Sequence, residues 1–420
     1  MSQLDPARNR LRALRLGVDL TDAGAHPTVW REVGTRHAQQ FDLPTFLSHI
    51  AAAQNAVFDF AVIGDSFGIQ PGGNSVYQGR VDSALIASRV APVTRGIGLV
   101  PSINVTHTEP FHVSKLVATL DYVSRGRAGW EPTVSLSATE AKLFGRKDVQ
   151  TAHSAWQEAG EVTDVVRRLW DSWEDDAEIR DAATSRFVDR DKLHYVDYEG
   201  INFKVKGPSI TPRPIQGHAV TVVSIPRDLD QQEHAIDVAA READIVRIQV
   251  EDAEEASALR QRLKAQAAEH GRDPESVIVL ADIFVVTGEN PSTAQVRYDI
   301  LRDLEPAGTS DHLTLTLRHV GTAAALAGTI AQWFTDGVVD GFVIRPAALH
   351  TDLREVIDFT IPKLQNRGLF PRSYRGATFR EHLGLERPAN RYELERDQNQ
   401  DQDQGQSIGS LLTAEANASA

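Results

Sequence analysis

Eight short apolar runs, separated by segments with helical periodicity, constrain the fold of this chain more than any other feature. The runs cover residues 14–20, 58–64, 96–104, 128–134, 220–225, 245–250, 277–286 and 341–344. Apolar residues recur three and four positions apart in segments between them, as at 43–56, 111–124 and 155–173, which is typical of helices that bury one face. Alternating strands and helices favour parallel βα units. Eight units predict an α/β fold in which one (β/α)8 barrel, a TIM barrel, closes on itself.

Two stretches interrupt the alternation of strands and helices. Residues 175–218 hold short β-like pieces and several prolines, and we expect an insertion after the fourth strand. Residues 303–328 lack clear periodicity and predict a smaller insertion after the seventh strand. Insertions that follow strands lie on the catalytic face of a barrel, where they can act as lids.

We expect residues 1–390 to form a single barrel domain. Residues 391–420 contain few bulky apolar side chains and many Gln and Asp residues, which predicts a disordered tail.

The composition excludes several classes of function. The chain has 44 basic and 58 acidic residues and a formal charge of −14, which argues against nucleic acid and anionic membranes as partners. It has no Cys, which excludes disulfides, a thiolate zinc site and a Cys nucleophile. No apolar stretch has the length of a signal peptide or a membrane span. We therefore expect a cytoplasmic protein that acts on small molecules.

Familiar ligand-binding motifs are missing from the sequence. There is no Walker A sequence, no HExxH and no strand followed by a full GxGxxG. His107 and His112 are five residues apart with no carboxylate at metal-ligand spacing, so we expect surface or helix-capping histidines and no metal site.

Polar residues gather instead where the predicted strands end. The carboxyl ends of parallel strands meet at one mouth of a barrel, which is where ligands bind in this fold. The polar side chains that we expect there are Asp65, Ser66, Thr106, His107, Glu131, Ser224, Arg227 and Arg345. Glu131 stands out, because it follows a bulky Trp and precedes a Pro at the end of a strand.

Four segments carry a resemblance to a known family. They are "HTEPFHVSKLVATLDYVSRGRAGW" (107–130), "LWDSWEDDA" (169–177), "GPSITPRPIQGH" (207–218) and "IPKLQNRGLFPRSYRGATFREHLGL" (361–385). These segments resemble the flavin-dependent monooxygenases of the bacterial luciferase superfamily. Within it, they are most similar to the branch that oxidises nitrilotriacetate, EDTA, dibenzothiophene sulfone and long alkanes. The resemblance covers residues 16–388.

The resemblance implies an enzyme that receives reduced FMN from a separate flavin reductase and reacts it with O2 to oxygenate a small organic substrate. It also implies a homo-oligomer. The cofactor supplies the difficult chemistry, and the protein positions it and excludes water.

Several residues match the family pattern. "GDS" (64–66) is similar to the family's Ala-Asp-Ser, and Thr106 lies where the family places a hydroxyl near the flavin ring. "HPTVWR" (26–31) resembles the family's first-loop His and Trp-Arg. By this resemblance Asp65 and Thr106 are cofactor-binding candidates, and His26 and His107 are catalytic candidates.

Other residues depart from the family pattern at the centre of the site. Glu131 stands where the family has an Asn that bonds the flavin, and an ionised Glu only accepts hydrogen bonds. Trp156 follows Ala155 where the family has Arg-Tyr. The family's phosphate loop is replaced by "VVSIPRD", in which Ser224 and Arg227 are the candidate ligands and Arg227 can supply the missing charge.

Three interpretations of Glu131 remain open. It is a catalytic or cofactor-binding group in a changed site, a mark of a site that has lost FMN, or simply exposed at a strand end. A buried carboxylate there requires a partner such as Arg227, or else it takes up a proton. The alternatives to a monooxygenase are accordingly a non-catalytic homologue that binds a ligand or assembles with other proteins, and an oxidoreductase that uses a deazaflavin.

Overall fold

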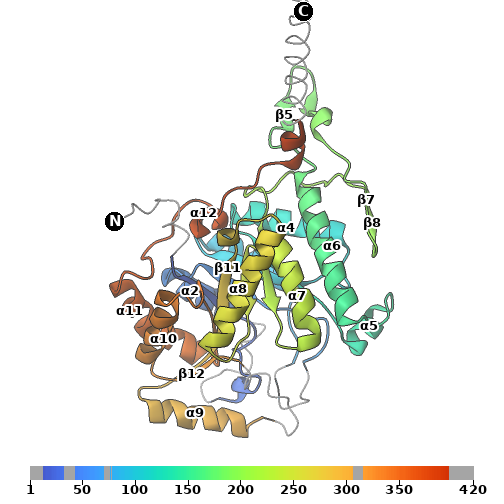
Figure 1. Cartoon of the computed structure of the whole chain (residues 1–420). Helices are drawn as coiled ribbons and strands as arrows, with labels where there is room; N and C mark the ends of the chain where they lie inside the picture. The colour runs from blue at the N-terminus through green and yellow to red at the C-terminus, as the bar shows by residue number, and fades with distance from the viewer. Residues whose placement is uncertain (1–12, 33–42, 71–75, 77, 306–315, 397–420) are drawn as a thin grey trace, which may run out of the picture.

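The computed structural model describes residues 13–32, 43–70, 76, 78–305 and 316–396 (Figure 1). Eight parallel strands form one closed sheet, which confirms the predicted TIM barrel. Around the barrel they are β1 (Arg15–Asp19), β2 (Phe60–Ile63), β3 (Gly98–Asn104), β4 (Gly129–Thr133), β9 (Val220–Ile225), β10 (Ile245–Ile248), β11 (Ile278–Thr287) and β13 (Gly341–Pro346). Pairing of β13 with β1 and of β10 with β11 closes the ring.

Helices cover the outside of the barrel. They are α2 (Leu43–Asn55), α3 (Ser83–Val90), α4 (Pro110–Ser124), α6 (Ala152–Asp171), α7 (Leu229–Glu242), α8 (Ala253–Glu269), α10 (Ala323–Thr335) and α11 (Ile361–Asn366). Most begin at a polar residue placed to cap them: the side chains of Asp82, Thr151, Asp228 and Asp252 each accept a hydrogen bond from a backbone N–H of the first turn. The caps fix where each helix leaves the carboxyl end of its strand.

The amino end of the barrel is closed by α12 (Phe379–Leu383), which lies at the opposite end from α9 (Pro291–Asp303) (Figure 1). The Phe379 ring fits beneath Gly98, where an added Cβ would come within 2.7 Å of it. Arg380 donates from all three of its nitrogens, to both Asp244 carboxylate oxygens at 2.9 and 3.0 Å and to the Glu386 carbonyl at 2.8 Å. The C-terminal run that carried part of the resemblance therefore plugs the barrel.

The lower interior of the barrel is apolar. Its side chains pack on the α12 plug and lie on alternate positions of the strands. They are Phe60, Val62, Val100, Val220, Val222, Ile245, Ile278, Leu280 and Val343. We call this group the apolar tier.

Residues 175–218 lie outside the barrel strands and form two hairpins, β5 (Glu178–Asp181) with β6 (Arg186–Val188) and β7 (Tyr198–Glu199) with β8 (Lys204–Val205). The expectation that this insertion lies on the catalytic face is met only in part, because it follows helix α6 rather than a strand and therefore starts at the amino end. Only the tip of β7–β8 turns back along α6, where Glu161 accepts the backbone N–H of Ile201 at 3.1 Å (Figure 1).

The described part of 303–328 is more regular than predicted. β12 (Arg318–Gly321) pairs with the upper end of β11, and α10 begins at Ala323. The Leu317 N–H donates to the Val250 carbonyl, so β12 continues beside β11 from where β10 stops. Residues 306–315 lie outside the described residues.

The prediction of disorder from residue 391 onward is wrong for residues 391–396, which are helical. Tyr392 stacks on His194 with ring centroids 3.9 Å apart, and Arg396 pairs with Glu174 at 3.0 Å. The two contacts dock this segment on the 175–218 insertion and on Glu174 just before it. Residues 397–420 lie outside the described residues.

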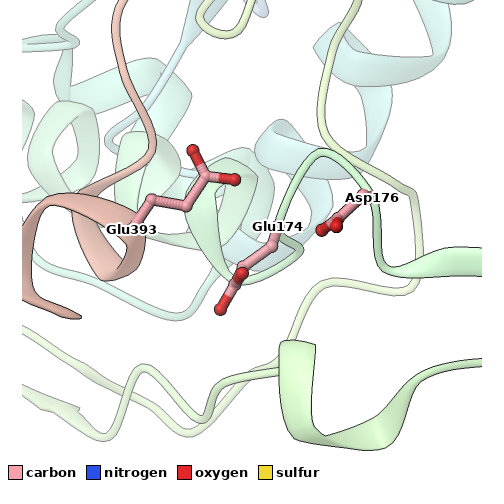
Figure 2. Close-up of side chains that lie close together, drawn as sticks. All are labelled: Glu174, Asp176 and Glu393. Carbon is pink, nitrogen blue, oxygen red and sulfur yellow. The ribbon is translucent and has the colours of Figure 1, made fainter. Parts of the chain in front are cut away.

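An acidic group, Glu174, Asp176 and Glu393, lies beside this docked segment (Figure 2). Glu174 is already paired with His194 at 2.9 Å and with Arg396, and Asp176 is paired with Lys192. Docking of the C-terminal segment therefore accounts for Glu174, and the Lys192 pair accounts for Asp176. Among the described helices, none is both long and apolar enough to span a membrane.

Candidate active site

Charged side chains fill the barrel interior directly above the apolar tier. Glu131, on β4, is 4% exposed and accepts a hydrogen bond from the Ser102 hydroxyl at 2.7 Å on one oxygen and from Arg247 at 3.0 Å on the other. Both of its oxygens are therefore occupied. The interpretation that Glu131 is exposed is wrong.

Arg247, on β10, is the centre of this charged group. Its guanidinium donates to both oxygens of Asp282 at 3.0 and 2.8 Å, to Glu131, and to Asp19 at 3.5 Å. Burial alone would lower the pKa of Arg247, but the three carboxylates outweigh burial and raise it. The arginine is charged at every pH at which the protein folds, and it compensates carboxylates that could not otherwise be buried.

Arg345 and Asp19 lie at the top of the group, nearest the mouth. Their side chains are 21% and 14% exposed, and Arg345 Nε lies 3.7 Å from Asp19 Oδ2. Arg345 Nη1 lies 4.0 Å from Asp282. These distances are ion pairs but too long for hydrogen bonds. Arg345 donates no hydrogen bond to any residue that the structure describes, and its Nε is buried. We call Asp19, Ser102, Glu131, Arg247, Asp282 and Arg345 the ionic tier.

Arg227 is not the partner of Glu131. It is 27% exposed and pairs with Glu251 at 2.8 Å and with Glu255 at 3.1 Å. The Asp228 carboxylate caps α7 by accepting the Gln231 N–H, so a further negative charge lies at that helix start. Ser224 is in register with Arg247 on the neighbouring strand and is half-buried, so it lies beside the ionic tier.

Asp65 and Thr106 hold loops in place at the mouth. The Asp65 carboxylate accepts the backbone N–H of Ser66 at 2.7 Å and of Ser83 at 2.9 Å, while burial raises its pKa. The Thr106 hydroxyl oxygen accepts the Ser135 N–H at 3.0 Å. That bond uses the oxygen as an acceptor and leaves the hydroxyl proton for another partner.

His107 lines a cavity of about 270 Å³ at the mouth, together with Thr106, Phe144, Lys147 and the hairpin residue Phe203. Its ring stacks on Phe144 with centroids 4.6 Å apart and planes 5° from parallel. Burial and the nearby Lys147 ammonium lower the pKa of His107, which favours the neutral imidazole. Lys147 is fixed by the Thr106 carbonyl at 2.8 Å.

His26 lies in the loop after β1 and is 1% exposed. Its Nδ1 is 3.0 Å from the Thr28 hydroxyl, and its Nε2 is 2.9 Å from Glu305. Burial lowers the pKa of His26 to about 4, so the ring is neutral at physiological pH. Its contacts place it against Phe284 of β11, with ring centroids 6.3 Å apart.

Trp156 does not meet the other predicted residues at the ionic tier. It is buried on α6 and lines a groove of about 540 Å³ between α6 and α7, with His153 and His234. Its indole N–H is buried and has no hydrogen-bond partner in the described part of the chain.

The structure thus brings Glu131 and Ser224 to the ionic tier, and Thr106 and His107 to one cavity. The sequence reasoning missed Arg247, Asp282 and Asp19. A signal for them exists: each is a charge within or at the end of an apolar strand, at an alternate position that faces the barrel interior.

Comparison with known proteins agrees with this architecture. A model of the luciferase-like monooxygenase family matches residues 26–343. The chain is 29% identical to N-acetyl-S-(2-succino)cysteine monooxygenase of Bacillus subtilis (strain 168), over 91% of this chain and 99% of that protein. It is 28% identical to nitrilotriacetate monooxygenase component A of Aminobacter aminovorans, over 90% and 98%.

A solved structure shows the same fold. EDTA monooxygenase from Chelativorans sp. BNC1 superposes with a TM-score of 0.79 at 23% identity, over 89% of this chain and 99% of that one. On the family match, this chain belongs to the luciferase-like monooxygenase family and is an enzyme of that family.

Proposed function

We propose that this chain is the oxygenase component of a two-component, FMNH2-dependent monooxygenase. It takes reduced FMN from a separate flavin reductase and uses O2 to oxidise a small organic substrate. The observation that carries the proposal is the mouth of the barrel, where Arg345, 21% exposed and with a buried Nε donor that is unused among the described residues, lies at the top of the ionic tier in a chain of this family. A relative named as "component A" supports a separate partner component.

The residues at the mouth fit the ring of a flavin. Arg345 offers hydrogen-bond donors and Asp19 an acceptor, and Ser224 on β9 adds a hydroxyl in register with Arg247. When bound, reduced flavin supplies the electrons that activate O2. Arg345, Asp19 and Ser224 would hold the ring and orient it toward the cavity lined by His107 and Phe144.

The residues at the start of α7 do not offer the cation that we expected for the FMN phosphate. Arg227 is neutralised by Glu251 and Glu255, and the Asp228 carboxylate occupies one first-turn amide, that of Gln231. This loss of phosphate ligands is the observation that favours the second candidate function, a homologue that has given up flavin chemistry.

The substrate cavity supplies apolar walls and a neutral imidazole. Phe144 and Phe203 provide apolar surface that excludes water, and His107 can accept or donate one proton at its ring nitrogens. Lys147, held by Thr106 and paired with Glu158, provides a cation at the rim. The cavity therefore suits a small molecule with an apolar body and a polar group.

The test is an anaerobic titration of the purified protein with reduced FMN, in which calorimetry measures the heat of binding. The proposal predicts saturable binding of reduced FMN at micromolar concentration. It does not require the protein to speed the oxidation of NADH by an added flavin reductase. A protein that binds no reduced FMN at millimolar concentration would be the non-catalytic homologue. Binding of a reduced deazaflavin in preference to FMN would indicate the third class.

A further inference from the structure

Arg345 differs from the other buried arginines that the strands and α12 bring into the barrel. Arg247 and Arg380 donate hydrogen bonds to carboxylates from both ends of their guanidinium groups. Arg345 is mostly buried, yet none of its N–H groups reaches an acceptor on a described residue within hydrogen-bonding distance. Its Nε is buried, and a buried donor without an acceptor is costly, so a ligand that accepts from this group would be stabilised.

The side chain faces the mouth. Val343, two residues earlier on β13, belongs to the apolar tier inside the barrel, so Arg345 also faces inward and lies one step nearer the strand ends. Its nearest charged neighbours are Asp19 and Asp282, on the adjacent strands. A molecule that enters the mouth meets Arg345 and Asp19 first, because they are the most exposed charged members of the ionic tier.

The charges of the ionic tier limit the kind of molecule that Arg345 can bind. Asp19, Glu131 and Asp282 carry three negative charges, and Arg247 and Arg345 carry two positive charges, which leaves a net charge of −1. A carboxylate placed on Arg345 would lie beside Asp19 and be repelled by it. A group with an acceptor next to a donor avoids this repulsion, because it can use both residues.

Asp19 is suited to the accepting role. One of its oxygens accepts the Thr21 N–H at 3.0 Å, and the other has only the long contacts to Arg247 and Arg345. Burial raises its pKa, but the two arginines outweigh burial and lower it, so Asp19 is an ionised acceptor at neutral pH.

We propose that Arg345 and Asp19 together recognise the cyclic imide edge of the flavin ring, with Arg345 donating to the ring carbonyl and Asp19 accepting the ring N3–H. The inference rests on the proposed function and adds to it the residues that fix the orientation of the ring. It makes Arg345 and Asp19 positioning residues for the cofactor, whichever substrate the enzyme oxidises.

The experiment compares reduced FMN with its reduced N3-methyl analogue, by anaerobic calorimetry, on four proteins. Methylation removes the donor that Asp19 would accept, and it should weaken binding to the wild-type protein by about ten- to a hundredfold. In Asp19→Ala this penalty should fall below about threefold, because the acceptor is gone. Arg345→Met should weaken reduced FMN by about ten- to a hundredfold and keep the methylation penalty.

Arg260→Met is the matched control. Arg260 is a cation of similar exposure, 22%, but it donates at 2.7 Å to Asp340, which precedes β13 at the amino end of the barrel. Its replacement should change flavin affinity by less than about threefold. Far-ultraviolet circular dichroism checks that each variant is folded, and Asp19→Leu, which also lacks an acceptor, replaces Asp19→Ala if the latter is not.

The outcomes separate the two proposals. A wild-type protein that binds reduced FMN and its N3-methyl analogue equally well overturns the inference and leaves the proposed function standing. Unchanged flavin affinity in Arg345→Met, with a raised KM for an identified substrate, also overturns it and assigns Arg345 to the substrate. A wild-type protein that binds no reduced flavin overturns both.

Discussion

The two halves of the barrel interior are filled by side chains of opposite character, apolar in the lower half and charged in the upper half. In the apolar tier, Phe60, Leu280 and Val343 fill the space with hydrocarbon over the α12 plug. In the ionic tier, Glu131, Asp282 and Arg247 fill it with charge. Hydrocarbon is stabilised by burial alone, whereas each charge must find a partner. The upper half can therefore interact specifically with a polar ligand, and the lower half can only support it.

A second comparison is between an arginine that stabilises the fold, Arg380, and one whose hydrogen-bond donors are free within the described residues, Arg345. Arg380, at the amino end, satisfies all three nitrogens with Asp244 and the Glu386 carbonyl. Arg345, at the carboxyl end, satisfies none within the described residues. The number of unused donors, more than burial or charge, distinguishes the two roles.

The largest effect is expected from Arg247→Met. It leaves Glu131 and Asp282 buried without their cation, which should cost about 3 to 5 kcal/mol in the free energy of unfolding. Urea unfolding followed by circular dichroism measures this. Arg227→Met, which breaks a half-exposed ion pair, is the control and should cost less than about 1 kcal/mol. Similar losses in the two variants would show that the ionic tier is not held by Arg247.

Leu280→Ala tests the other half of the comparison. Removing a fully buried side chain from the apolar tier should cost about 2 to 5 kcal/mol in the free energy of unfolding. The affinity for reduced FMN should stay within about twofold, because the cavity lies below the ionic tier. A loss of flavin affinity as large as that expected for Arg345→Met would mean that the two tiers do not act separately.

His26 predicts a pH dependence of stability. Its pKa is about 4 in the folded protein and 6.5 is its ordinary value. The unfolded chain therefore binds the proton first as pH falls, and stability should decrease between about pH 6.5 and pH 4 by up to about 3 kcal/mol. Urea unfolding of wild type and His26→Gln at several pH values checks this. If the free energy of unfolding falls equally with pH in the two proteins over that range, His26 is not the group responsible.

The smallest effect is expected from Arg227→Ala on cofactor binding. Glu251 and Glu255 already neutralise this arginine, so its loss should change the affinity for reduced FMN by less than about threefold. Anaerobic calorimetry measures the change. A tenfold loss would restore Arg227 as a phosphate ligand and would require its ion pairs to break on binding.

The fold was predictable because strand and helix periodicities are local signals. Eight apolar runs marked the barrel strands, and only β12 was misread as irregular, since it has four residues and a polar sequence, "RHVG". The composition of residues 175–218 does not show where the insertion starts. The helix predicted at 155–173 does, because it carries the chain back to the amino end before the insertion begins.

The site was predictable in part, for a physical reason. Strand ends gave the mouth and its polar residues, including Arg345 and Glu131. Partner choice across the barrel is not local: Glu131 pairs with Arg247, 116 positions away in the sequence, and not with Arg227. The available signal was that Arg247 and Asp282 occupy strand positions whose side chains face the barrel interior. A charge at such a position must be paired.

The most direct test of this account is a crystal structure of the protein with FMN bound. The account predicts the isoalloxazine ring at the carboxyl end of the barrel, with its pyrimidine edge within hydrogen-bonding distance of Arg345 and Asp19. A ring that lies in the groove between α6 and α7, or beside α12 at the amino end, would contradict it.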